Sequence, residues 1–494
     1  MKYTHNTAAI LCLLLVSAMI SCGDSEASVD TAAPDSTPDT SITETAVDDD
    51  RLPAPAVTDM NGAELRIMNP TPESFNWATT TILVEEADGD VLNDALFNRE
   101  RTVEELYNCT ITELPTDRGD METKIPNAVA AGDKFFDTAM VFDASVSNYL
   151  LKDCLMSWDE IGGLDLSNPW WDNAATREYN FSGIQAAVTG AYSLYNYSTR
   201  HVYVFNAKMM SDLDIEDDIY DMVRAGKWTV DELYRLGEMA VSDLNGDGTM
   251  HEDDDRFGIT ATPTRHYSAI LMGSGVRYID RDNNGALYFA IDGNEYAQSV
   301  MSKFVRLDQS NPDIFNDKKA DINNDISTVF TDGRSMFCAA YVGEAAKMRG
   351  LEFDIGFVPA PKFDEAQENY YSLVEGGAQS ILPRMLEEDD LAKVGTILDA
   401  FAYYSYYESI PAYIDVLIMG KVARNEDSEE MLQLVFDTSA YDLGTGVWSS
   451  DTKNKYVSSI FSSSKDTVAS QTERFRNVIN KQLDKFMTAL EDLS

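Results

Sequence analysis

Histidine and basic residues are both scarce in this chain. Only four of the 494 residues are His, and His5 lies in an N-terminal segment that we expect to be removed. Metal sites and active sites built from several histidines are therefore not expected. The 38 Lys and Arg residues are outnumbered by 84 Asp and Glu, which gives a formal net charge of -46. Because binding to phosphate groups requires a basic surface, this composition excludes nucleic acid as a partner.

Cysteine is also rare, and its spacing carries no metal signal. Beyond the first 22 residues only Cys109, Cys154 and Cys338 remain, with no CxxC pair among them. At most one disulfide could form, and its presence is left open. We interpret the three thiols as small buried apolar side chains.

Long hydrophobic runs are missing as well. The longest, from Ala8 to Ile20, is too short to span a bilayer, and Lys2 precedes it, which is typical of an export signal over residues 1–22. The run ends in Met19-Ile20-Ser21-Cys22, which resembles the bacterial lipobox except for Met19 in place of the usual Leu. We therefore expect Cys22 to be lipidated at the extracytoplasmic face of a membrane; an ordinary cleavage site is the alternative.

Residues 23–60 are predicted to be a flexible tether between Cys22 and the folded part of the chain. Between Gly23 and Asp50 there are nine acidic residues and nine Ser or Thr, with no Lys, Arg or aromatic residue. Such a segment cannot form a core. From Asn61 onward, a chain that is 44% hydrophobic overall can bury a large core.

The folded part alternates between strand and helix patterns, which favours an α/β fold with largely parallel sheets. Strands are predicted at 63–68, 109–114, 138–142 and 353–361. Helices are predicted at 91–107 and from the capping pair Thr229 and Glu232 through about residue 241. Apolar residues from Val468 to Leu490 recur at helical spacing, which indicates a packed C-terminal helix.

Five motifs occur in a fixed order: KWTVDELYRL around Trp228, DLNGDG at 243–248, FTDGRSMF at 330–337, DIGFVPAPK at 354–362 and YDLGTGVW at 441–448. Together they resemble the extracellular solute-binding proteins of bacterial ABC importers, in the maltose-binding-protein-like group called family 1. The resemblance implies a periplasmic-binding-protein-like fold, in which two α/β lobes joined by a hinge hold a ligand in a central cleft.

The same resemblance implies where the chain passes between the lobes. Lobe 1 would contain residues 61–206 and about 378–415, and lobe 2 residues 207–377 and about 416–494. The crossings would lie near Val204–Lys208, Gly376–Pro383 and Ile410–Met419.

The resemblance also implies a set of ligand-binding residues, and for each a plain role in the core is the alternative. These residues are Phe142, Asp143, Trp171, His266, Tyr267, Tyr341, Gly376 and Trp448. Aromatic faces suit the C–H side of a sugar ring, and carboxylates and amides suit its hydroxyls.

One loop has the spacing of a calcium site. Oxygen-bearing side chains occupy Asp243, Asn245, Asp247 and Asp254, and the carbonyl of Thr249 would complete the set. The last position is Asp rather than Glu, and His251 is a poor ligand. A structural Ca²⁺ is therefore one interpretation, and a solvated turn is the other.

No catalytic motif of the GxSxG, HExxH, GxGxxG or GxxxxGK[ST] type is present. We expect no enzymatic activity and no required cofactor. The predicted function is a membrane-anchored monomer that captures a solute, most simply a mono- or oligosaccharide, and delivers it to an ABC transporter permease. A carbohydrate-active enzyme and a surface sensor or adhesin remain as alternatives. The sequence leaves the ligand and the permease unidentified.

Overall fold

The computed structural model describes residues 51–75, 78–261, 263–310, 314–316, 327–418 and 426–492. Contacts divide the chain into two units, Met1–Arg51 and Leu52–Ser494, and every element below belongs to the second. The predicted signal peptide, Cys22, and residues 23–50 of the predicted tether lie outside the described residues.

The folded body begins at Leu52, before the predicted end of the tether at residue 60. The Leu52 N–H donates to the Tyr407 hydroxyl at 3.0 Å, and its carbonyl accepts from the Tyr403 hydroxyl at 2.9 Å. The Tyr107 hydroxyl donates to the Pro55 carbonyl at 2.7 Å. Composition could not show that residues 52–60 are part of the folded body, because the tyrosines that hydrogen-bond to them lie far along the chain.

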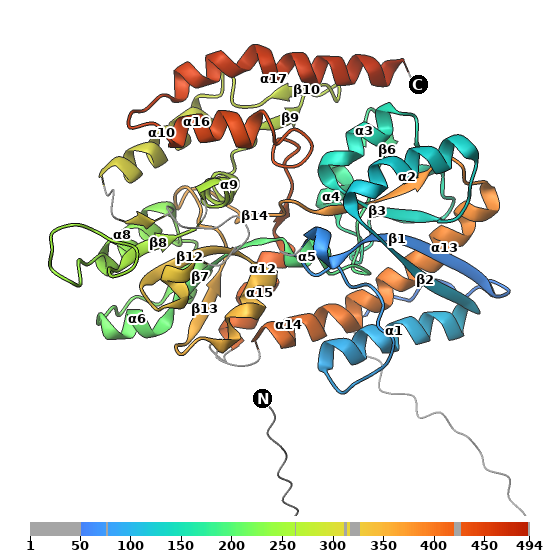
Figure 1. Ribbon diagram of the computed structural model, residues 1–494, viewed down its shortest axis with the longest axis horizontal. Helices are drawn as coiled ribbons and strands as arrows, with labels where there is room; N and C mark the ends of the chain where they lie inside the picture. Colours follow the sequence, from blue (N-terminus) through green and yellow to red (C-terminus); the bar gives the residue numbers. More distant parts are fainter. Residues whose placement is uncertain are drawn as a thin grey trace, which may run out of the picture. The chain divides into compact units, whose positions relative to one another are not determined.

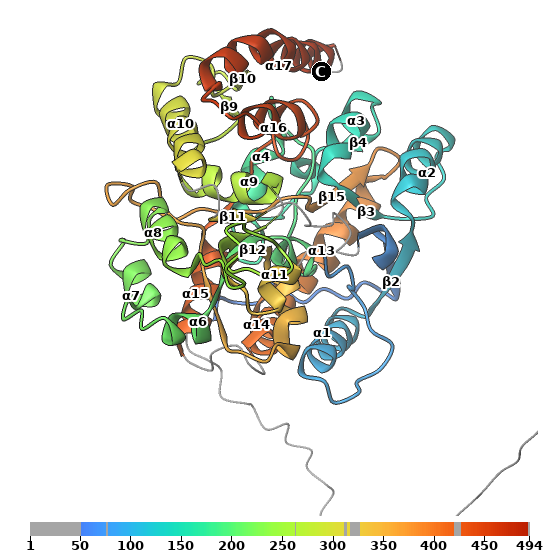
Figure 2. The same ribbon diagram turned by 60° about the vertical axis from the view of Figure 1, so that its left-hand side comes forward.

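The first sheet contains five strands in the order β2-β1-β3-β15-β4. Figure 1 labels β1, β2 and β3, and Figure 2 labels β15 and β4. Their bounds are β1 Ala63–Pro70, β2 Cys109–Thr116, β3 Thr138–Phe142, β4 Leu155–Met156 and β15 Ala378–Pro383. Strands β1, β2 and β3 run parallel, whereas β15 is antiparallel to both β3 and β4. Helices α1 (Val91–Tyr107) and α13 (Glu388–Tyr404) pack against each other, and each contacts this sheet.

Helix α1 has the predicted bounds, and local chemistry explains both ends. The Asp90 side chain accepts from the N–H groups of Leu92 and Asn93, both at 3.1 Å, which satisfies donors that the first turn leaves free. Asn108 ends the helix with φ at 47°, a left-handed conformation that Asn tolerates. The predicted start of α8 (Val230–Ala240) is also confirmed, since the Thr229 side chain accepts from the Glu232 N–H.

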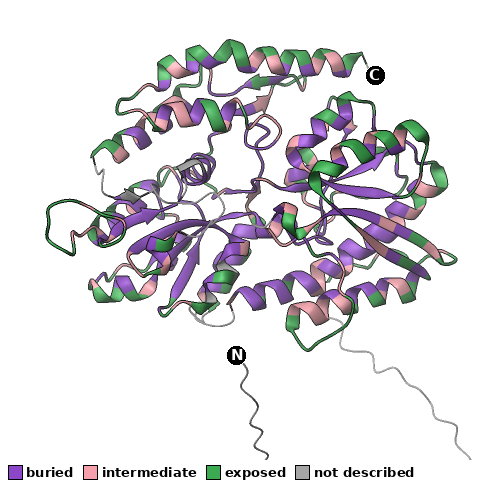
Figure 3. Cartoon of the chain, in the orientation of Figure 1, coloured by how far each residue is buried: buried purple, intermediate pink, exposed green. Residues whose placement is uncertain are grey.

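The second sheet has the order β11-β8-β12-β7-β13. Its strands are β7 His201–Asn206, β8 Phe257–Thr260, β11 Phe315–Asn316, β12 Ser335–Tyr341 and β13 Ile355–Val358. Strands β8 and β12 are parallel, and β7 is antiparallel to β12 and β13. Helices α8, α9 (Pro263–Gly273) and α15 (Glu426–Asp437) pack on this sheet, and the strands of both sheets are mainly buried (Figure 3).

Strand β7 lies in the second sheet, so the lobe boundary predicted at residue 206 falls one strand too late. Every residue of β7 is buried. An uninterrupted apolar run predicts a buried strand, but it does not show with which strands, or in which sheet, that strand pairs. The first crossing is therefore at residues 199–200 rather than at 204–208.

Three short segments pass between the sheets next to one another. Arg200 forms an antiparallel bridge with Val374, and β14 (Ser372–Leu373) pairs in parallel with β16 (Ser439–Ala440). Helix α14 (Ile410–Ile418) packs against α1, whereas α15 packs against β13. The chain thus returns to the second lobe between α14 and α15, close to the predicted third crossing, whose last residue, Met419, lies outside the described residues.

The C-terminal helix α17 (Val468–Glu491) contacts elements of both lobes. It packs on α10 (Glu295–Ser310) and β10 (Leu287–Phe289), and it also contacts α3 (Val146–Leu151) of the first lobe (Figures 1 and 2). Phe486 on this helix lies 5.2 Å from Phe181, ring centre to ring centre. Its buried stripe confirms the predicted packing: Val468, Thr472, Phe475, Ile479, Leu483, Phe486 and Leu490.

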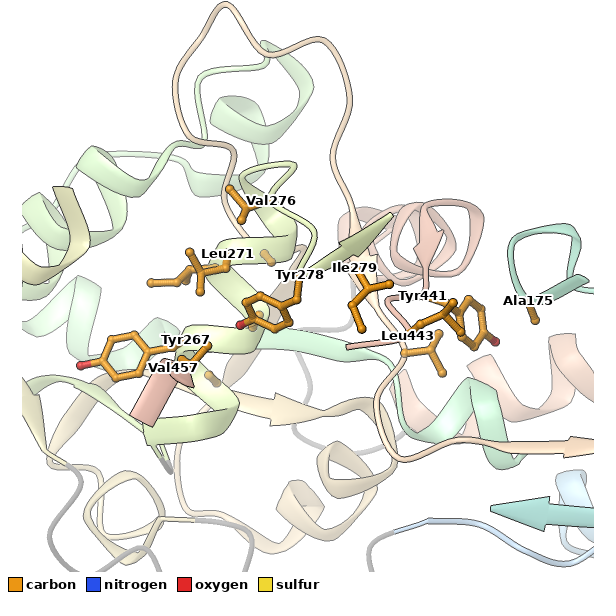
Figure 4. Packing of buried hydrophobic residues seen from close by; sticks show 14 of the residues in the cluster. Ala175, Tyr267, Leu271, Val276, Tyr278, Ile279, Tyr441, Leu443 and Val457 are labelled. Atoms are coloured by element: carbon orange, nitrogen blue, oxygen red, sulfur yellow. The ribbon is translucent and has the colours of Figure 1, made fainter. Parts of the chain in front are cut away.

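One hydrophobic cluster extends through both lobes. Figure 4 shows part of it, from Tyr267 and Leu271 on α9, past Tyr278, to Tyr441 and to Ala175 on α4 (Asn173–Glu178). Cys109, Cys154 and Cys338 are free and buried, as interpreted from the sequence. Among the described residues, no helix combines the length and apolar character that a membrane crossing needs.

Candidate binding site between the two lobes

Four strand ends meet where the chain crosses between the sheets. In the first sheet Phe142, the last residue of β3, pairs with Ala378, the first of β15. In the second sheet Tyr341, the last residue of β12, pairs with His201, the first of β7. Side chains at these ends, and on the segments that connect them, form a buried polar cluster.

Asp143 directly follows β3 and is 3% exposed. Its N–H donates to the Gly377 carbonyl at 3.0 Å, and its Oδ1 accepts from the Ala144 N–H at 2.6 Å. Burial raises the pKa of this carboxyl to about 7, although the hydrogen bond from the Ala144 N–H and the Lys453 ammonium favour the charged form. A Cβ on Gly446 would lie 2.9 Å from Asp143 Oδ2, so the absence of a side chain there permits the close approach of the C-terminal loop.

Glu375 sits on the second crossing segment between two basic groups. Its carboxylate accepts a hydrogen bond from Lys453 Nζ and is 2.8 Å from His201 Nε2. Burial alone would raise the pKa of Glu375, but the Lys453 ammonium and the bond to His201 outweigh it and lower the pKa to about 2. Burial lowers the pKa of His201, and its bond to Glu375 offsets part of that effect. The cluster therefore holds a charged Glu375–Lys453 pair beside a neutral imidazole.

Tyr341 provides an aromatic ring at the second-sheet edge of the cluster. Its ring meets that of His201 edge to face at 4.9 Å. The Arg265 guanidinium lies 4.0 Å from the Tyr341 ring centre, and its Nη1 contacts both carboxylate oxygens of Glu344, at 2.8 and 3.0 Å. One face of Tyr341 is thus covered by a cation that is itself paired.

Several buried polar atoms near Asp143 and Glu375 have no hydrogen-bond partner in the protein. They are Tyr195 Oη, Thr199 Oγ1, His201 Nδ1 and both amide atoms of Gln379. Tyr195 lies within electrostatic range of Asp143 and Tyr341, and the Gln379 amide lies beside Gly377. Since buried polar groups are almost always hydrogen-bonded, this concentration marks the cluster as a candidate site for a polar ligand or for bound water.

An ion-pair cluster joins the lobes beside this site. Glu178, at the end of α4 on the first-lobe side, accepts from Arg277 at 2.5 Å and from Arg281 at 3.1 Å. Both arginines follow α9 on the second-lobe side. Asp442 lies near Arg277 and accepts from the Tyr278 N–H at 2.5 Å; burial raises the pKa of this carboxyl to about 7.

Two further predicted ligand-binding residues, Phe142 and Gly376, lie at or next to these strand ends, whereas Trp448 and Trp171 pack against other elements. Phe142 is half-buried, 5.6 Å from Phe75 and with the Arg118 guanidinium 4.6 Å above its ring. Gly376 adopts φ of 66° on the crossing segment, which suits Gly. Trp448 is half-buried against Phe486, and Trp171 is buried with its Nε1 donating to Asp399 at 2.8 Å. Ligand contact by any of them stays a prediction.

His266 and Tyr267 are not brought into the polar cluster. His266 is fully buried, its Nδ1 lies 2.9 Å from the Tyr203 hydroxyl, and burial lowers its pKa to about 3. The Tyr267 hydroxyl donates to Asp308 at 2.6 Å. The neighbouring Arg265 reaches the cluster instead, because successive residues on a helix point about 100° apart.

The calcium-like loop forms a turn stabilised by its own side chains. Asp243 accepts from the N–H groups of Gly246 and Gly248, at 2.6 and 2.8 Å, and Asp247 accepts from Thr249 at 2.8 Å. Among the described residues, no three His, Cys, Asp or Glu side chains are grouped to hold a metal ion. Ca²⁺ at Asp243, Asn245, Asp247, Thr249 and Asp254 remains a prediction.

Sequence reasoning missed Glu375, Lys453, His201 and the Glu178 ion pairs. Lys453 and Glu375 are 78 positions apart, and Glu178 and Arg277 are 99 apart. No local pattern connects such residues. The one available signal is that basic residues are scarce, with 38 Lys and Arg against 84 Asp and Glu. A basic residue in this chain is therefore more informative than an acidic one.

Comparisons with known proteins bear on the fold. No protein-family model matches the chain, and no curated protein matches its sequence. Among solved structures, the cyclic alpha-maltosyl-1,6-maltose binding protein from Arthrobacter globiformis is 14% identical, with 86% of this chain and 100% of that chain covered and a TM-score of 0.57. An ABC substrate-binding protein from Listeria monocytogenes in complex with cycloalternan is 11% identical, with 86% and 99% covered and a TM-score of 0.54.

UgpB from Mycobacterium tuberculosis in complex with glycerophosphocholine is also similar, at 15% identity, with 80% and 98% covered and a TM-score of 0.53. At these identities the likeness concerns the fold. The predicted α/β, two-lobed periplasmic-binding-protein-like fold is confirmed.

Proposed function

We propose that this protein is an extracytoplasmic substrate-binding protein that captures an oligosaccharide between its lobes and delivers it to an ABC transporter permease. It acts as a monomer, performs no chemistry on its ligand, and is held at the membrane through lipidated Cys22. The observation that carries the proposal is the group of unpartnered hydroxyl, imidazole and amide atoms buried beside Asp143 and Glu375.

The chemistry of this cluster suits a neutral polyhydroxyl ligand. Hydroxyl groups both donate and accept, so they can satisfy Tyr195, Thr199 and both atoms of the Gln379 amide. Lys453 is paired with Glu375 and Arg265 with Glu344, so neither of these cations is free for an anionic ligand. Arg118 lies outside the buried cluster, exposed over the Phe142 ring. The two similar structures bound to, or named for, maltose-type or cyclic sugars agree with this choice.

The test compares two buried glutamines with opposite surroundings. The Gln379 amide has no partner in the protein, so Gln379→Met should leave stability unchanged or raise it. It should weaken oligosaccharide binding by about tenfold, the effect of losing hydrogen bonds to ligand. Gln185 is buried too, but its amide donates to the Thr176 and Ala187 carbonyls at 2.9 and 2.8 Å. Gln185→Met should therefore lower stability and leave affinity unchanged.

Isothermal calorimetry and thermal unfolding on purified protein provide both readouts. The titrants are maltotriose, a cyclic glucose tetrasaccharide and glycerophosphocholine. Binding of either sugar, weakened only by Gln379→Met, supports the proposal. Binding of glycerophosphocholine alone, or sugar binding that Gln379→Met does not change, contradicts it.

A further inference from the structure

A cavity lies on the other side of the crossing segments from the polar cluster described above. Its volume is 310 Å³. It is lined by the start of α4 and the residues before it, by Tyr197 of α5 (Tyr195–Ser198), by Arg200 on the first crossing segment, and by residues of α14 and α15. Elements of both lobes therefore surround it.

Strand geometry separates this cavity from the polar cluster. Successive residues of an extended segment point to opposite sides. His201, the first residue of β7, points to Glu375, at 2.8 Å. Arg200, directly before it, points the other way, to Ser439 and Asp172.

Arg200 is the central feature of the cavity wall. It is 3% exposed, its Nε donates to Ser439 Oγ at 2.6 Å, and its Nη2 donates to Asp172 Oδ2 at 3.3 Å. Its guanidinium lies 4.2 Å from the Tyr197 ring centre and 5.1 Å from that of Phe436. Nη1 is buried and has no partner in the protein. A fixed, buried guanidinium with a free N–H requires an acceptor.

The surrounding charges and rings define the kind of acceptor. Asp172 and Asp437 also line the cavity, so Arg200 is outnumbered and a free anion would be repelled. Burial raises the pKa of Tyr197 and of Tyr406, and Asp437 raises each further, so both phenols stay neutral donors. Aromatic faces, carboxylates and one free N–H together match a neutral molecule with several hydroxyl groups.

We propose that this cavity is a second binding site, for a neutral polyol of monosaccharide size, whose binding shifts the Arg200 side chain so that its covered Nη1 donates to a ligand hydroxyl oxygen. Its volume of 310 Å³ is at the small end of ligand pockets, too small for the oligosaccharide proposed for the interlobe site. Hydroxyl groups of the ligand donate to Asp172 and Asp437, and one face of the ring packs against the aromatic side chains.

Calorimetric titration with D-glucose, myo-inositol and inorganic phosphate tests the site. Gln433 is an exposed cavity-lining residue of α15, so Gln433→Trp should fill the cavity and abolish polyol binding. Glu429 lies one turn earlier on α15, is exposed and does not line the cavity, which makes Glu429→Trp the matched control. Arg200→Lys keeps the charge but loses the planar fork and should weaken binding by about tenfold or more.

Gln379→Met distinguishes the two sites, because it alters only the interlobe cluster. The proposal is supported if the heat of polyol binding is retained in Gln379→Met and Glu429→Trp and lost in Gln433→Trp. If this heat is lost in Gln379→Met and retained in Gln433→Trp, the polyol binds at the interlobe site and the proposal is overturned. Absence of polyol heats in the wild-type protein, or saturable phosphate binding in their place, also overturns it, and neither result bears on oligosaccharide capture.

Discussion

Replacing Glu178 with Gln should loosen the contact between the lobes. The Glu178 side chain is 2% exposed and accepts from Arg277 and Arg281, which come from the opposite lobe. Gln can keep part of the hydrogen bonding but not the charge. The two guanidinium groups would then face each other across a buried site without their shared counter-ion.

The size of the effect follows from burial. Removing one partner of a fully buried ion pair costs about 3–5 kcal/mol. The side chains of Arg277 and Arg281 are 24% and 19% exposed, so water screens part of the remaining charge. We expect about 2–3 kcal/mol, which shifts an equilibrium between joined and separated lobes by about 30-fold or more. Ligand affinity falls by up to the same factor where the joined state becomes the minor one.

Small-angle scattering without ligand and calorimetry with ligand measure these effects. Glu178→Gln should increase the radius of gyration and weaken binding, and saturating ligand should restore the compact form. Arg177→Gln is the control. Arg177 is on the same helix, but its side chain is exposed and its Nε comes no closer than 3.8 Å to the Glu178 carboxylate. If Glu178→Gln unfolds more readily but keeps its scattering profile and affinity, the ion pair stabilises the fold without controlling the lobes.

Other perturbations test separate parts of the molecule. The Asp143 pKa of about 7 exceeds the ordinary 3.8, so between these pH values the folded state binds more protons than the unfolded state and the free energy of unfolding falls as pH rises. Urea unfolding at about pH 5 and about pH 8 should show this fall in the wild-type protein and not in Asp143→Asn. Trp448→Ala should weaken sugar binding by about 30-fold in calorimetry if its ring covers about 80 Å² of ligand, about 2 kcal/mol, and unchanged affinity would exclude stacking there. EDTA should lower the melting temperature if the loop at Asp243 holds Ca²⁺, and an unaltered melting curve favours the solvated turn. Cys22→Ser should remove the protein from the membrane fraction, and wild-type recovery there would refute the lipid anchor.

The sequence predicted local elements well and long-range partners poorly. Helix Val91–Tyr107 and strand Thr138–Phe142 have their predicted bounds because an apolar period and a short buried run are local signals. Strand β7 was assigned to the wrong lobe because its six buried residues fit either sheet.

The candidate site shows the same division. Asp143 could be placed because it directly follows a strand, and the family resemblance named the strand end. Glu375 and Lys453 could not, because 84 acidic residues offer no way to choose one, and their pairing exists only after folding. On α9, the prediction named His266, which is buried against Tyr203, whereas the preceding residue, Arg265, reaches Tyr341 in the polar cluster. Neighbouring residues on a helix point in different directions, so an error of one position changes which side chain reaches the site.

The position of β15 in the first sheet constrains the order in which the lobes can be built. This strand lies between β3 and β4, yet about 220 residues separate it from them. The second sheet, by contrast, uses one uninterrupted stretch from β7 to β13. During synthesis the second lobe can therefore assemble while β3 still presents an unpaired edge, and the first lobe closes only after residue 383 is available. Pulse-labelled hydrogen exchange should show amides of β12 protected before those of β3, and simultaneous protection would contradict this order.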